Sequence, residues 1–125
     1  MWHILASAMG GAIGCVSRYF LAETIYEAWG DVFPYGILVA NVIGCLLMGC
    51  LATIMVHKME LSIVWRGAVL VGFLGGLTTF SSFSLDTVRL IEEGFVAKAA
   101  IYVLASVVLC VSATLLGVFV AEKVS

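Results

Sequence analysis

The chain has 125 residues, of which 63% are hydrophobic and only 11% are charged, and its mean hydropathy is +1.18. A soluble domain of this size would carry about 25% charged residues. The composition therefore excludes an ordinary soluble domain and indicates a chain that lies mostly within a bilayer.

The few charged residues are separated by long apolar stretches. Three stretches contain no Asp, Glu, Lys or Arg: 35–56, 67–85 and 99–121. Each meets or approaches the ~20 residues that a helix needs to cross a bilayer. A fourth apolar segment runs from Ile4 to about Tyr26 and is interrupted by Arg18 and Glu23. We therefore predict an all-α membrane protein, with one transmembrane domain over residues 1–125 and spans at about 4–26, 35–56, 63–90 and 96–121.

The basic residues favour neither side of the membrane. With four spans, equal numbers fall on the two sides, namely Lys58, Arg66 and Lys123 on one and Arg18, Arg89 and Lys98 on the other. Orientation normally follows a bias in Lys and Arg, and here there is none. In so short a chain the tie can arise by chance. We favour insertion in both orientations and an antiparallel homodimer, because four short helices can hardly enclose a pathway alone.

Small residues recur at the spacing that allows membrane helices to approach closely. Gly10 and Gly14 form one such pair, and Gly72 and Gly76 form another. These pairs fit ordinary packing within one chain, and they also fit association between chains.

The stretch "FLGGLTTFSSF", at positions 73–83, is a poor sequence for a continuous helix in lipid. Gly75 and Gly76 permit a break, so we predict that the third helix is broken near Gly75–Thr79. Irregular backbone at membrane depth is tolerated inside protein or along a cavity. Phe80 and Phe83 would then project to the same side. Their positive ring edges suit an anion, although most phenylalanine pairs merely pack.

Two polar residues lie inside predicted spans. Asn41 is either a hydrogen-bonding link between helices or a pore residue whose amide donates to an anion. Arg18 either extends to the lipid headgroups or lines a water-filled entrance that attracts anions.

The fourth span carries hydroxyl and thiol groups every four residues, at Tyr102, Ser106, Cys110 and Thr114. They either bond to their own helix backbone or form a polar track for an ion, which Ser82 could continue.

The sequence lacks the residue patterns of cation exporters, of cysteine-based sites and of enzymes. The central parts of the spans contain no Asp or Glu, which proton-coupled cation exporters need. The cysteines, Cys15, Cys45, Cys50 and Cys110, form no CxxC motif and are expected to be packing residues. No nucleophile and base are suitably spaced, so we expect no enzyme activity and no nucleic-acid partner.

The segments "GGAIGCVSR", "ANVIG" and "GGLTTFSSFS" closely resemble those of the Fluc (CrcB-type) fluoride channels, and the resemblance covers the whole chain. It implies a fluoride-selective passive channel in the bacterial inner membrane, which exports cytoplasmic fluoride and gives fluoride resistance. It also implies a dual-topology antiparallel homodimer with two pores along its interface.

The resemblance further implies roles for individual residues. Phe80 and Phe83 would meet fluoride with their ring edges, and Asn41 would be the pore asparagine. The family's polar track would consist of Ser82, Tyr102 and Ser106, while Cys110 stands where a hydroxyl would extend it. Arg18 would lie near the vestibule. A structural Na⁺ at the dimer centre would be held by the backbone carbonyls of Gly75 and Thr78.

Two other classes of membrane protein fit the sequence less well. A small multidrug-type exporter would need an acidic residue in the first span, and positions 4–17 have none. A structural or lytic oligomer would have no reason to combine a glycine break, paired phenylalanines and a buried asparagine.

Overall fold

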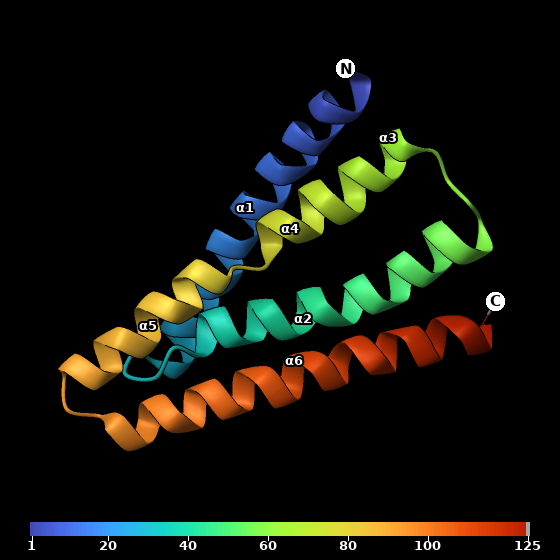
Figure 1. Ribbon diagram of the computed structural model, residues 1–125. Coiled ribbons are helices and arrows are strands. Elements are labelled where there is room, and N and C mark those ends of the chain that lie inside the picture. Colours follow the sequence, from blue (N-terminus) through green and yellow to red (C-terminus); the bar gives the residue numbers. More distant parts are fainter. Residues whose placement is uncertain (125) are drawn as a thin grey trace.

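The structure is a computed structural model that describes residues 1–124 as helices joined by short loops (Figure 1). The elements, in chain order, are α1 (Trp2–Trp29), α2 (Tyr35–Ala52), η1 (Thr53–Lys58), α3 (Ile63–Arg66), η2 (Gly67–Leu74), α4 (Gly75–Leu77), α5 (Phe80–Glu92) and α6 (Val96–Val124). The elements η1 and η2 are wider, π-type helical turns that no sequence signal predicted. The all-helical class predicted from the sequence is confirmed across the described residues.

Four runs of these elements are long and apolar enough to cross a membrane: Trp2–Trp29, Tyr35–Lys58, Ile63–Glu92 and Val96–Val124. Their number agrees with the four spans predicted from the sequence. Each run continues a few residues past its predicted end, because helical hydrogen bonding does not stop where the hydrocarbon ends. Charged residues such as Glu92 and Lys123 therefore still lie on helices.

The loops include two glycines with positive φ. Gly30, with φ of 86°, ends α1 and donates its N–H to the Tyr26 carbonyl at 2.8 Å. Gly94, with φ of 88°, lies between α5 and α6 and donates to the Ile91 carbonyl at 3.0 Å. Positive φ is disfavoured for residues with a side chain, so glycine permits both turns.

The helices pack in two pairs. Helices α2 and α6 lie side by side over most of their length, and α1 packs against η2 and α4 (Figure 1). After the break in the third span, α5 packs against α6. The third span therefore changes neighbours at the break. The broken backbone lies where side chains from both helix pairs can reach it.

Glycines allow the backbones of α1 and the third span to touch. A Cβ atom at Gly14 would lie 2.1 Å from the Phe73 carbonyl oxygen, and one at Gly72 would lie 2.5 Å from that of Ser7. At Gly76 the added atom would lie 2.7 Å from the Gly11 carbonyl oxygen. Packing within the chain thus accounts for the small-residue pairs of both segments.

Candidate functional site

The third span is interrupted at two consecutive threonines. Helix α4 ends at Leu77, Thr78 has φ −96° and ψ 155°, and Thr79 has φ −153° and ψ 117°. The break falls within the predicted range but not at the two glycines, since Gly75 keeps helical angles of −63° and −36°. The glycine at 76 serves the close contact with α1, while the β-branched threonines adopt the extended conformation.

Asn41 on α2 binds both backbone groups of Thr79. Its Oδ1 accepts from the Thr79 N–H at 2.8 Å, and its Nδ2 donates to the Thr79 carbonyl at 3.2 Å. In a continuous helix the same N–H would donate to the Gly75 carbonyl. Asn41 is therefore a hydrogen-bonding link between helices, which is one of the two roles that the sequence allowed for it. Its Nδ2 carries a second hydrogen that this pairing does not use.

Arg18 on α1 binds the same break from the other side. Its Nε donates to the Gly76 carbonyl at 3.0 Å, the carbonyl that would accept from the Phe80 N–H in a continuous helix. The side chain is half-buried. Arg18 thus compensates the broken backbone, in addition to any effect of its charge on ions.

Thr79 also starts the next helix. Its Oγ1 accepts from the Ser82 N–H at 3.1 Å and lies 3.2 Å from the Ser81 hydroxyl. This is an ordinary N-cap, in which a threonine side chain binds a backbone N–H that has no partner within the helix. The cap fixes the direction of α5 and therefore the positions of Phe80 and Phe83.

A pocket of about 290 Å³ lies beside the break, and we call it the Phe80 pocket. Its lining consists of Asn41, Cys45, Thr78, Thr79, Phe80, Phe83, Ser106, Val107, Cys110 and Val111. It brings together four of the predicted pore residues from three spans. None of the residues that line it is charged.

The two phenylalanines differ in their surroundings. Phe83 is 9% exposed, whereas Phe80 is 79% exposed, and their ring centroids lie 5.3 Å apart with the planes at 55°. Across the pocket, the Ser106 hydroxyl is buried and has no hydrogen-bond partner among the described residues. A buried hydroxyl without a partner is costly, so it marks a position where a ligand or water would be stabilised.

Tyr102 lines neither pocket, but it contacts Phe83 of the Phe80 pocket and Asp86 of a second pocket. Its side chain is fully buried, and its ring centroid lies 5.1 Å from that of Phe83. Its hydroxyl donates to Asp86 Oδ2 over a long 3.5 Å. The predicted track residues Tyr102 and Ser106 thus lie in succession along α6.

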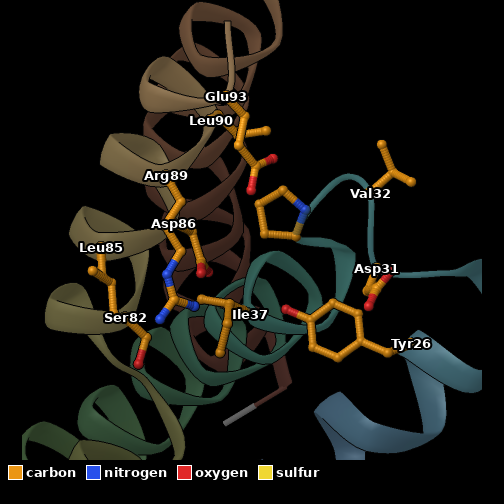
Figure 2. A pocket seen from close by; sticks show the side chains of 11 residues that line it. Tyr26, Asp31, Val32, Ile37, Ser82, Leu85, Asp86, Arg89, Leu90 and Glu93 are labelled. Atoms are coloured by element: carbon orange, nitrogen blue, oxygen red, sulfur yellow. The ribbon is translucent and has the colours of Figure 1, made fainter. Parts of the chain in front are cut away.

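The second pocket, of about 460 Å³, contains the predicted residue Ser82 and is shown in Figure 2. Its lining is formed by Tyr26, Asp31, Val32, Pro34, Ile37, Ser82, Leu85, Asp86, Arg89, Leu90 and Glu93. Asp86 and Arg89 are not among the predicted site residues, because both lie near the end of a span. The spacing of Ser82, Asp86 and Arg89, at i, i+4 and i+7 on α5, could have placed them on one face.

Residues 1–124 contain no cluster of three or more His, Cys, Asp or Glu side chains that could hold a metal ion. For a hard cation, the donors available at the break are backbone carbonyls. At the break, Gly75 and Thr78 lie where the regular helical hydrogen bonding stops.

Substitution of Asn41 by Ala should destabilise the protein. It leaves the N–H and the carbonyl of Thr79 without their partners, which we expect to lower the free energy of unfolding by about 1 kcal/mol or more. The matched control is Val42→Ala, which removes apolar volume from the adjacent position but no hydrogen bond. The thermal unfolding midpoint in detergent measures both. Equal midpoints for the two variants would contradict the role of Asn41 in holding the break.

The chain is similar to known proteins over nearly its whole length. The model of the family described as CrcB-like protein, Camphor Resistance (CrcB), matches residues 5–118. A protein of Citrifermentans bemidjiense named fluoride-specific ion channel FluC is 44% identical over 122 residues, which are 98% of each chain. The protein of that name from Geobacter sulfurreducens is 44% identical over 123 residues, 98% of this chain and 99% of the relative.

A third protein of that name, from Methylococcus capsulatus, is 46% identical over 122 residues. The chain spans only about half of that relative, with 98% of the chain matching 54% of the relative's length. The names of these relatives are those of ion channels and not of enzymes. Since the family model and the relatives cover nearly the whole sequence, the chain belongs to the CrcB-like (FluC) family.

Proposed function

We propose that this chain is a fluoride-specific passive channel that lets cytoplasmic fluoride leave across the bacterial inner membrane. The names and the full-length similarity of its relatives support this function. The observation that carries it is the Phe80 pocket, where two phenylalanine rings meet an asparagine amide and a serine hydroxyl without a charged side chain. The whole chain would act as one transmembrane domain.

Fluoride in the Phe80 pocket would exchange water for weak donors. The second Nδ2 hydrogen of Asn41, the unpartnered Ser106 hydroxyl and the ring edges of Phe80 and Phe83 are the donors available there. Because no lysine or arginine lines the pocket, an anion would be stabilised without being trapped by a full opposite charge. Ser82 and Tyr102 would extend the pathway toward the second pocket.

Selectivity against chloride would follow from size. A pathway that packed helices enclose on all sides cannot widen freely, because protein interiors are close-packed. Chloride is larger than fluoride, so a rigid pathway of this kind would exclude it. Arg18 would add a positive charge near the vestibule, which raises the local concentration of anions.

The pathway would be completed by a second copy of the chain. Phe80 is a pore residue in this proposal, yet it is 79% exposed in a single chain, so one wall of the pocket is missing. The equal numbers of basic residues on the two sides fit insertion in both orientations. An antiparallel homodimer would supply the wall twice and so form two equivalent pores.

A structural Na⁺ fits the break at the centre of such a dimer. The Thr79 N–H is bound to Asn41, so it does not compete for the Gly75 carbonyl. The carbonyls of Gly75 and Thr78 are hard oxygen donors of the kind that hard cations prefer. One chain offers two of them here. The symmetry-related partner would offer the same two, so the ion would have four oxygen ligands at the dimer centre.

Replacing Phe80 by Leu tests the function. The exposed ring supports little of the fold in one chain, so the chain should still fold while fluoride loses a ring-edge donor. We expect fluoride efflux from liposomes to fall at least about tenfold, the factor given by about 1.4 kcal/mol of lost stabilisation. A fluoride electrode records the efflux in the presence of a potassium ionophore. The control is Phe119→Leu, which replaces an exposed ring on α6 outside the Phe80 pocket. If both variants conduct like the unaltered protein, Phe80 is not a pore residue.

Removal of sodium tests the metal proposal. A cation that binds only the folded dimer stabilises it by mass action, so the unfolding midpoint should rise with Na⁺ concentration. The comparison is made at constant ionic strength, with choline replacing Na⁺ and light scattering reporting the dimer. A midpoint and a dimer fraction that do not depend on Na⁺ would overturn the assignment of Gly75 and Thr78 as its ligands.

A further inference from the structure

Two cysteines from different spans meet in the Phe80 pocket. Cys45 on α2 and Cys110 on α6 both line it, one from each of two helices that pack side by side. The Thr114 hydroxyl lies 3.1 Å from both the Cys45 and the Cys110 carbonyl oxygens. A single hydroxyl therefore holds the two cysteines at the same level of the two helices.

Close contact between α2 and α6 holds the backbones of the two cysteines near each other. A Cβ atom at Gly49 would lie 2.1 Å from the Thr114 carbonyl oxygen, and one at Gly117 would lie 2.3 Å from that of Leu46. Because the backbones of α2 and α6 touch on this side, the two cysteines cannot separate without unpacking the helices. The pair is thus organised before any ligand arrives.

The thiols lie one helical turn from the proposed fluoride donors. Asn41 and Cys45 are four residues apart on α2, and Ser106 and Cys110 are four residues apart on α6. Residues at this spacing lie on the same face of a helix. An ion bound between the thiols would therefore lie directly next to the amide and the hydroxyl that are proposed to pass fluoride.

Two thiols without further ligands select a particular class of metal. Soft cations such as Ag⁺ and Cu⁺ prefer thiolate ligands, and they are satisfied by two in a linear arrangement. Zinc would need four ligands, and residues 1–124 contain no cluster of three or more candidate side chains. On binding, each thiol would release its proton to the medium, so that one cation joins two thiolates.

The geometry points to a soft-cation site formed by Cys45 and Cys110, whose occupancy blocks the Phe80 pocket. Binding of the cation depends only on the two thiols. The inference that the bound cation blocks fluoride rests on the proposed function. The packing role expected for the cysteines is compatible with this site. The close contact between α2 and α6 both packs the two side chains and brings them to the same pocket.

Silver binding tests the site without any measurement of flux. The double variant C15A/C50A keeps only the pair, and it is dialysed against silver nitrate in chloride-free detergent buffer before elemental analysis. We expect one Ag⁺ per chain. Adding C45A or C110A should weaken binding at least about tenfold, since even outer-shell changes cost a metal site that much. No bound silver, or silver bound as tightly after either thiol is removed, would overturn the site.

Fluoride efflux from liposomes tests the block. Chloride is left out because it precipitates silver, and each variant is compared with its own silver-free rate. We expect Ag⁺ to stop efflux through the unaltered protein and C15A/C50A, excess dithiothreitol to restore it, and C45A to resist at the same concentration. Silver that binds as expected but leaves efflux unchanged would overturn the block. If the protein shows no efflux even without silver, the proposed function is overturned. The silver-binding measurement then tests the cation site by itself.

Discussion

The pairing of the Asn41 amide with the Thr79 peptide is the interaction on which the rest of the structure depends. At membrane depth no water replaces a lost backbone hydrogen bond, so a broken helix needs partners from the protein. Asn41 supplies a donor and an acceptor to Thr79, and Arg18 supplies a donor to the Gly76 carbonyl. The two polar side chains that stand out in the sequence are thus both bound to the break.

The break has two consequences for the site. It moves the third span from its contacts with α1 to contacts with α6, and the Thr79 cap starts α5 in a new direction. Phe80 and Phe83 therefore face Ser106 and Cys110 across a pocket that a continuous helix would not form. In the proposed function, binding at this pocket and stability of the fold would be coupled, since Asn41 would serve both.

The sequence predicts the parts of this account that depend on composition and spacing. The charge-free stretches predict the spans, and the run from Gly75 to Phe83 predicts the break. The exact residues of the break could not be predicted, because packing of Gly76 on the Gly11 carbonyl decides where the helix stays regular. The partners of Arg18, the second pocket around Asp86 and the meeting of Cys45 with Cys110 depend on contacts between distant segments, which spacing within one helix does not reveal.

The most direct test of the account is efflux from liposomes that contain the purified protein and are loaded with either fluoride or chloride. A potassium ionophore compensates the charge, and electrodes specific for each ion record release. The account predicts rapid fluoride release that depends on the ionophore, with no chloride release. Equal release of both ions would contradict the size-based selectivity proposed for the Phe80 pocket. The absence of any release from well-folded protein would contradict the channel itself.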